Sequence, residues 1–148
     1  MDNDISAYEL VGQLNEFQQL YSTIEKKVLK NNHLNQSSFS IMSQLVEQAL
    51  TLKELTALFS LDKSTLSRQI NGLVQQGFII KESGTDKRIY YLSISKEANQ
   101  LVNAVRFEIE FYVTDLFKAW PNEEKQLLLV LLGRVNRRIR LTNDLKET

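Results

Sequence analysis

Residues 63–76 carry polar side chains whose types and spacing could read the edges of nucleic-acid bases. In a helix each residue is rotated by about 100° from the last. One face of this segment would then hold only hydrogen-bonding side chains without an acid, namely Ser64, Ser67, Arg68, Asn71 and Gln75. Arginine can pair with guanine through two hydrogen bonds, and asparagine or glutamine can pair with adenine. The segment is a candidate DNA-reading helix, and the plainer alternative is an ordinary solvated helix face.

A second basic feature is the polar loop 82–88, which ends in Lys87 and Arg88. An arginine on such a loop can enter a minor groove, where narrow A·T-rich DNA concentrates negative potential. Residues 63–88 hold five basic and two acidic residues, a charge of +3 in a chain whose formal net charge is zero. A Lys-Arg pair on a turn is common, so the local charge balance is what favours a nucleic-acid partner.

The helix over 63–76 needs a second face that anchors it and signals that begin and end it. The anchoring residues are predicted to be Leu66, Ile70 and Leu73, which recur at helical spacing. Asp62 is suited to cap the helix start, because its side chain can accept from the free amides of the first turn. Gly77 is suited to end the helix, because glycine tolerates the left-handed conformation found there.

The neighbouring elements complete a recognisable outline. Thr51 and Glu54 have capping-box spacing, which predicts a short helix over 52–59. Two runs rich in β-branched and aromatic residues, 78–81 and 89–94, predict a β-hairpin after the helix over 63–76. Two helices joined by a short turn and followed by a hairpin outline a winged helix-turn-helix, in which the second helix enters the major groove.

Long helices are predicted on both sides of this outline, because the chain has one proline and five glycines. The expected ranges are 5–31 and 35–48 before it and 95–119 and 121–141 after it, each with apolar residues at helical spacing. The first and the last two carry more apolar residues than a small helix-turn-helix can cover. Such a surface usually marks an interface, so a homodimer is predicted. The alternative is a monomer that buries the same stripes internally.

The whole chain resembles the multiple-antibiotic-resistance-regulator (MarR) family of bacterial transcription factors. The specific parts are Leu61-Asp62-Lys63-Ser64-Thr65-Leu66-Ser67-Arg68 with its continuation to Ile79, and Asp86-Lys87-Arg88, which matches the Asp-x-Arg wing motif of the family. Ser95 and Ala98 stand where the family often has threonine and glycine. The resemblance implies a mainly α fold with a small β-hairpin wing: a winged helix-turn-helix with N- and C-terminal dimerisation helices.

The predicted domain is single and spans 1–148, with a DNA-binding lobe over about 35–94 and dimerisation helices over 5–31 and 95–143. The residues expected to contact double-stranded DNA are Lys63, Ser64, Thr65, Ser67, Arg68, Asn71, Lys87 and Arg88. By resemblance, Asp86 helps to position Arg88, and a small hydrophobic or aromatic effector occupies a pocket. The predicted pocket residues are Phe39, Phe107, Phe111 and Tyr112. Plain core is the alternative role for these four rings.

The predicted function is that of a sequence-specific DNA-binding transcriptional regulator, a homodimeric repressor acting on a pseudo-palindromic operator and released by an effector. An enzyme, a metal site and a cofactor are not expected. The chain has no cysteine and one histidine, and no Gly-rich phosphate loop or nucleophile elbow occurs in it. Its longest apolar run, 127–132, is too short for a membrane span, so a cytoplasmic protein is expected. The alternative function is a winged-helix module that binds protein without sequence-specific DNA binding.

Overall fold

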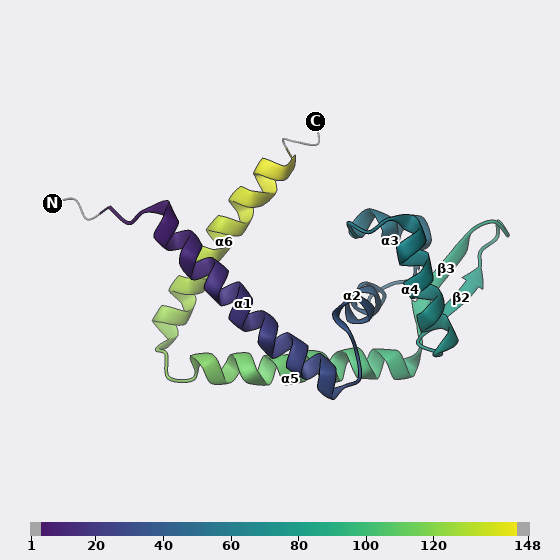
Figure 1. The fold of residues 1–148 in the computed structure, drawn as a ribbon, viewed down its shortest axis with the longest axis horizontal. Coiled ribbons are helices and arrows are strands. Elements are labelled where there is room, and N and C mark those ends of the chain that lie inside the picture. The colour runs from purple at the N-terminus through teal and green to yellow at the C-terminus, as the bar shows by residue number, and fades with distance from the viewer. Residues whose placement is uncertain (1–3, 145–148) are drawn as a thin grey trace. The chain divides into compact units, whose positions relative to one another are not determined.

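The computed structural model describes residues 4–144, which contain six helices and a three-stranded sheet (Figure 1). The chain divides into two compact units, the first ending at Glu110 and the second beginning at Phe111, so helix α5 contributes to both. The predicted mainly helical winged fold is confirmed. In chain order the elements are α1 (Ala7–Asn31), α2 (Gln36–Gln44), β1 (Leu50–Thr51), α3 (Leu52–Leu58), α4 (Lys63–Gln75), β2 (Ile79–Ser83), β3 (Tyr90–Ile94), α5 (Lys96–Phe117) and α6 (Asn122–Asp144).

The sheet has the strand order β1-β3-β2 and is antiparallel throughout. Strands β2 and β3 form the predicted hairpin, with Ile80 paired to Ser93. Strand β1 was not predicted, because two residues are too few to show an alternating pattern. It pairs Leu50 with Leu92 and joins the start of α3 to the edge of the hairpin. The sheet therefore connects the first helix of the helix-turn-helix directly to the wing.

Helix α2 is shorter than the predicted range 35–48, because it ends at Gln44. The N–H of Leu45 bonds to the carbonyl of Met42, a tighter turn than an α-helix makes. Leu45 is nonetheless buried and Val46 half-buried. Their apolar side chains extended the predicted helix too far, because residues in a turn can also point into a core.

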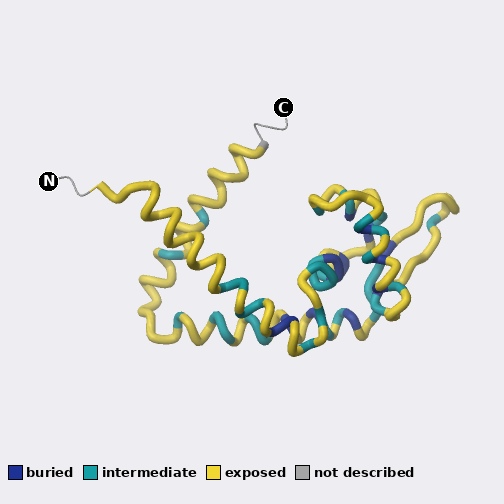
Figure 2. Tube along the Cα trace, in the orientation of Figure 1, coloured by how far each residue is buried: buried dark blue, intermediate teal, exposed yellow. Residues whose placement is uncertain are grey.

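The core of the first unit lies beneath α4 and the sheet (Figure 2). The three residues predicted to anchor α4 are all buried, and Leu66 is fully so. This burial fixes the rotation of α4 about its own axis and leaves the opposite face exposed. The buried cluster consists of Ile41, Met42, Leu45, Leu50, Leu55, Leu66, Ile70, Leu73, Ile79, Leu92, Ala98 and Val102.

Helix α4 ends at Gln75, one residue before the predicted end, and Gly77 closes it as predicted. Gly77 has φ of +78°, its N–H bonds to the carbonyl of Val74, and the N–H of Phe78 bonds to that of Leu73. These two bonds form a Schellman motif, which satisfies carbonyls at the helix end. The motif turns the chain directly into strand β2, so it sets where the wing begins.

Gly77→Ala is expected to destabilise the fold by about 1–2 kcal/mol, the cost of a left-handed conformation for an L-residue. A Cβ at position 77 meets nothing within 4 Å, so the cost comes from the backbone alone. The matched control is Gly72→Ala inside α4, where a Cβ is equally unobstructed. That change is expected to stabilise by about 1 kcal/mol. Urea unfolding at one protein concentration measures both, and loss of stability in Gly72→Ala would contradict this account.

Among the described residues, no helix combines the length and apolar character needed to cross a membrane. No group of three or more histidine, aspartate or glutamate side chains in the same part of the chain is arranged to hold a metal ion.

Candidate nucleic-acid interface

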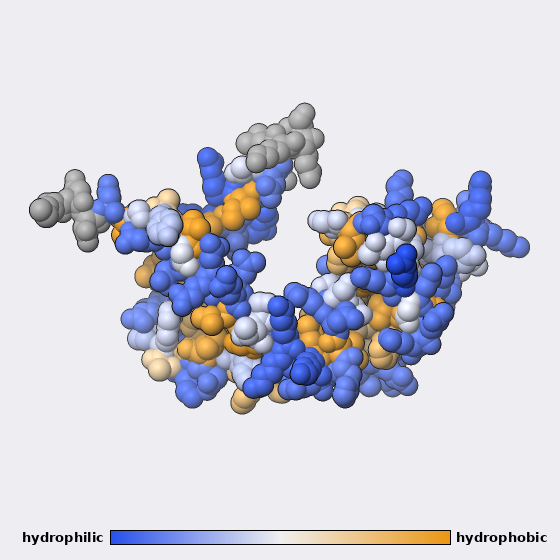
Figure 3. Space-filling view, viewed as in Figure 1, coloured by the Kyte–Doolittle hydropathy of each residue, from blue (hydrophilic) through white to orange (hydrophobic). Residues whose placement is uncertain are grey.

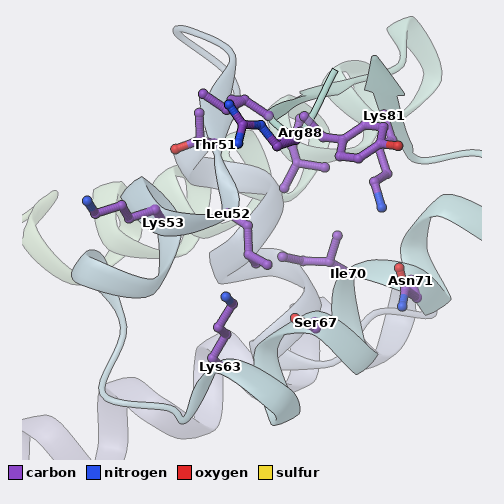
Figure 4. Close-up of a pocket in the computed structure, with 12 residues that line it drawn as sticks. Thr51, Leu52, Lys53, Lys63, Ser67, Ile70, Asn71, Lys81 and Arg88 are labelled. Atoms are coloured by element: carbon purple, nitrogen blue, oxygen red, sulfur yellow. The ribbon is translucent and has the colours of Figure 1, made fainter. Parts of the chain in front are cut away.

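A groove of about 360 Å³ lies between α4 and the inner face of the β-hairpin (Figure 4). Four of the side chains that line it are basic and none is acidic. Its walls come from β1 and the start of α3, from α4, and from strands β2 and β3 with the loop between them. The lining residues are Thr51, Leu52, Lys53, Lys63, Ser67, Ile70, Asn71, Lys81, Arg88, Ile89, Tyr90 and Leu92.

The structure brings four of the predicted DNA-contacting residues into this groove. Lys63, Ser67 and Asn71 reach it from α4, and Arg88 reaches it from the loop (Figure 4). Arg68 is exposed on α4 outside the groove, and it makes no ion pair within residues 4–144. The exposed face of α4 therefore offers both an arginine and an asparagine, the two residue types suited to reading bases.

Two more of the predicted contacts, Ser64 and Thr65, have their hydroxyl groups engaged by the cap of α4. Ser64 Oγ donates to Asp62 Oδ1 at 2.6 Å, and Thr65 Oγ1 donates to Asp62 Oδ2 at 2.8 Å. The backbone N–H of Thr65 also donates to Asp62, as the capping prediction required. A phosphate oxygen only accepts hydrogen bonds, so either hydroxyl would have to leave Asp62 to reach one. Their contact with DNA stays a prediction.

The same hydrogen bonds, that from Ser64 first, lower the pKa of the Asp62 carboxyl from 3.8 to about 2. A carboxylate whose pKa is lower in the folded state stabilises the fold above its unfolded pKa. That stabilisation is lost as the pH falls through the folded value. The stabilisation from Asp62 is therefore fully present above about pH 4, and it is lost between about pH 4 and about pH 2.

Asp62→Asn is expected to remove this contribution while keeping a side chain that can cap a helix. The melting temperature of the variant should lie below that of the wild type at pH 6, and the gap should narrow between pH 4 and pH 2. Thermal unfolding of both proteins across pH 2–6 measures it. The other carboxyl groups titrate in both proteins, so only the difference between the two curves reports Asp62. Parallel curves would contradict the assignment.

The hairpin loop is organised around Asp86. Its Oδ1 accepts from the backbone N–H of Arg88 at 3.0 Å and from Arg88 Nε at 3.3 Å, and its Oδ2 lies 3.4 Å from Nη2 of the same arginine. The Arg88 side chain is 90% exposed. An exposed pair of this kind contributes little to stability, so a DNA ligand could take the guanidinium at small cost. Lys87 is also exposed on this loop and lies outside the groove.

Sequence reasoning did not name Lys53 and Lys81 as site residues, although both line the groove. Lys53 lies in the first turn of α3, and the first helix of a helix-turn-helix crosses the DNA backbone, which could have signalled its role. Lys81 lies in β2, and in the sequence it contributes only to the local positive charge. Its place in the groove depends on the register of the sheet, which the sequence did not define.

The four rings predicted to form an effector pocket lie in different surroundings. Phe39 is half-buried and packs against the core of the first unit. Phe107 is 71% exposed on α5. In the second unit, Phe111 is 69% exposed and lies edge-on to the half-buried Tyr112, with ring centroids 6.2 Å apart. A shared pocket for these four residues stays a prediction.

The fold and the groove define a winged helix-turn-helix protein. A family model of the MarR family matches residues 34–89. The HTH-type transcriptional regulator YxaD of Bacillus subtilis is 31% identical over 116 residues, which are 77% of this chain and 81% of that relative. The chain belongs to the MarR family and is a helix-turn-helix transcriptional regulator of that family.

Solved structures agree on the fold. A MarR family protein from Bacillus stearothermophilus superimposes with a TM-score of 0.83 at 16% identity, covering 90% of this chain and 94% of that one. Wild-type MarR from E. coli in its apo form superimposes with a TM-score of 0.70 at 19% identity, covering 90% and 98%. At these identities the likeness concerns the fold alone.

Proposed function

We propose that the protein binds double-stranded DNA sequence-specifically as a homodimer and represses transcription from the bound operator. The observation that carries this proposal is the groove beside α4, lined by four basic side chains and no acidic one in a chain of zero net charge. Such a local concentration of positive charge is the electrostatic footprint of a nucleic-acid-binding surface.

In the proposed complex the exposed face of α4 enters the major groove, where Arg68 and Asn71 contact base edges. Arg88 enters the adjacent minor groove from the wing, and its release from Asp86 allows this. The burial of Leu66, Ile70 and Leu73 supports this arrangement, because it packs α4 on the core and leaves the opposite face exposed. A rigid element positions base-reading side chains better than a loop does.

Exposed apolar side chains support the proposed dimer. In the first unit, α1 exposes a stripe that includes Leu10, Leu14 and Phe17. In the second unit, α6 also exposes apolar side chains, and the burial and hydropathy views show exposed and apolar residues along this helix (Figures 2 and 3). Those on α6 are Leu127, Leu129, Val130, Leu131, Leu132, Val135, Ile139 and Leu141. A second copy would cover such surfaces, and a two-fold dimer would place its two α4 helices on half-sites about one DNA turn apart.

Release of the operator is proposed to follow from binding of a small hydrophobic or aromatic effector. Such an effector would bind preferentially to a dimer conformation in which the spacing of the two α4 helices does not fit DNA. Its binding would therefore lower the fraction of dimers that can bind the operator. The rings named above as candidates, Phe39, Phe107, Phe111 and Tyr112, remain the proposed contacts. Alanine substitution of Phe107 tests them, because its exposed ring contributes little to the core of the protomer.

The experiment that tests the function is selection of bound fragments from sheared genomic DNA, followed by gel shift at increasing salt. Recovery of a near-palindrome with half-sites one turn apart would support a dimeric, sequence-specific regulator. Sedimentation of the complex gives the number of protomers bound. Binding that disappears at modest salt and enriches no sequence would overturn the proposal in favour of a winged-helix module that binds protein.

A further inference from the structure

Lys81 occupies an unusual position on the inner face of the hairpin. Pairing in the sheet places Lys81 opposite Leu92, and residues two apart along a strand share a face. Ile79 and Leu92 on that face are buried in the core. Lys81 is therefore a cation on the side of the sheet that faces α4, at the point where the core ends and the groove begins.

The ring of Tyr90 contacts the ammonium group of Lys81. Tyr90 pairs with Ser83, so its ring lies diagonally across the hairpin from Lys81 on the same face. Lys81 Nζ lies 4.5 Å from the centroid of that ring, within the range of a cation–π interaction. The next residue, Glu82, points to the other face, and Lys81 makes no ion pair in the described part of the chain. Its charge is therefore directed into the groove, toward the helix that carries Asn71 (Figure 4).

The two grooves of a DNA duplex are separated by a sugar–phosphate backbone. A protein that places α4 in the major groove and Arg88 in the adjacent minor groove must therefore straddle one backbone strand. The space between α4 and the hairpin is the groove that Lys81 lines, together with Lys63 on the opposite wall. A lysine ammonium is a compact charge with three donors, which suits a phosphate better than a base edge.

We propose that Lys81 binds a backbone phosphate of DNA seated between α4 and the wing, and that Tyr90 is the residue that positions it. The inference rests on the proposed DNA-binding function and assigns a site that the sequence motifs did not include. Lys81 would hold the duplex in register between the residues that enter the two grooves. Its contribution would then be the same for every DNA sequence.

The test is the salt dependence of binding to the selected operator and to a scrambled duplex. Lys81→Ala is expected to lower the slope of log affinity against log salt by roughly one unit. It should weaken binding to both duplexes equally, by about five- to tenfold near 0.1 M salt. Lys81→Arg should retain most of the slope, because it keeps the charge. Lys26→Ala, which removes an exposed lysine on α1 away from the groove, is the matched control and should change neither quantity.

The role of Tyr90 is tested by a pair of variants in two backgrounds. Tyr90→Phe keeps the ring and should behave as the wild type, whereas Tyr90→Leu should lose part of the salt slope. In a Lys81→Ala background, Tyr90→Leu should have no further effect. An equal loss in both backgrounds would overturn the positioning role, because Tyr90 would then act on DNA directly.

The outcomes separate this inference from the proposed function. If the wild type enriches an operator and Lys81→Ala keeps its slope and affinity, the phosphate site is wrong while the function stands. If the wild type enriches no sequence but Lys81→Ala still lowers the slope on the scrambled duplex, the function is wrong and the phosphate site stands. No binding of any DNA by the wild type would overturn both.

Discussion

Arg68→Ala is expected to weaken binding to the operator by about 1–3 kcal/mol, the range for a bidentate contact between arginine and guanine. Arg68 is exposed on α4, opposite the buried Leu66, Ile70 and Leu73 that fix the rotation of the helix. It has no competing ion pair within residues 4–144, so its guanidinium is available to a ligand. The variant should also lose preference at one base pair of each half-site, because a contact to a base edge carries sequence information.

The measurement is a gel shift against the operator and a panel of single-base-pair changes, at fixed salt. Arg68→Lys is the matched variant, because it keeps the charge but lacks the planar fork. It should lose specificity almost as far as Arg68→Ala does. Arg106→Ala, on the exposed surface of α5, is the control and should bind normally. Weakening that is uniform across the panel would mean that Arg68 holds a phosphate. Unchanged affinity in both Arg68→Ala and Arg88→Ala would refute the DNA-contact model.

Much of the DNA-binding lobe was predictable because its signals are local. The cap at Asp62, the stripe on α4 and the glycine at position 77 each depend on residues within a few positions along the chain. Strand β1 and the end of α2 were missed or misplaced. Strand β1 depends on a tertiary partner, because Leu50 pairs with Leu92, 42 positions further along. A two-residue strand has no pattern of its own, and only the sheet defines it.

In the candidate site, too, local features were predicted and features that depend on distant residues were missed. Residue types identified the donors on α4, but they did not show which donors already have an acceptor. Ser64 and Thr65 have hydroxyl groups of the right chemistry, yet both donate to Asp62 two and three positions earlier. Lys81 was missed for the converse reason, since its place beside Tyr90 and across from α4 follows from hairpin register. Residue types and spacing predicted the donors on α4 and Arg88 on the loop, whereas the place of Lys81 in the groove required the register of the sheet.

The other large effect is expected in the core, at Leu66. This residue is fully buried and lies on the face of α4 opposite Arg68. Leu66→Ala should lower the free energy of unfolding by about 2–5 kcal/mol, because it removes buried methyl groups and leaves a cavity that a packed core fills only partly. The matched control is Leu58→Ala on α3, whose side chain is 57% exposed and should cost far less. Urea unfolding of both at one protein concentration measures the difference.

Comparing Leu66→Ala with Arg68→Ala separates loss of folded protein from loss of a base contact. The Leu66 substitution reduces the fraction of folded protein, so its effect on DNA affinity should shrink as the temperature falls well below its melting point. Arg68→Ala should leave the melting temperature nearly unchanged and weaken DNA binding at every temperature. If Leu66→Ala instead relaxes base preference while fully folded, α4 must shift or rotate on its core when the cavity opens. The rotation of the helix would then depend on Leu66 specifically, and Ile70 and Leu73 would not suffice to hold it.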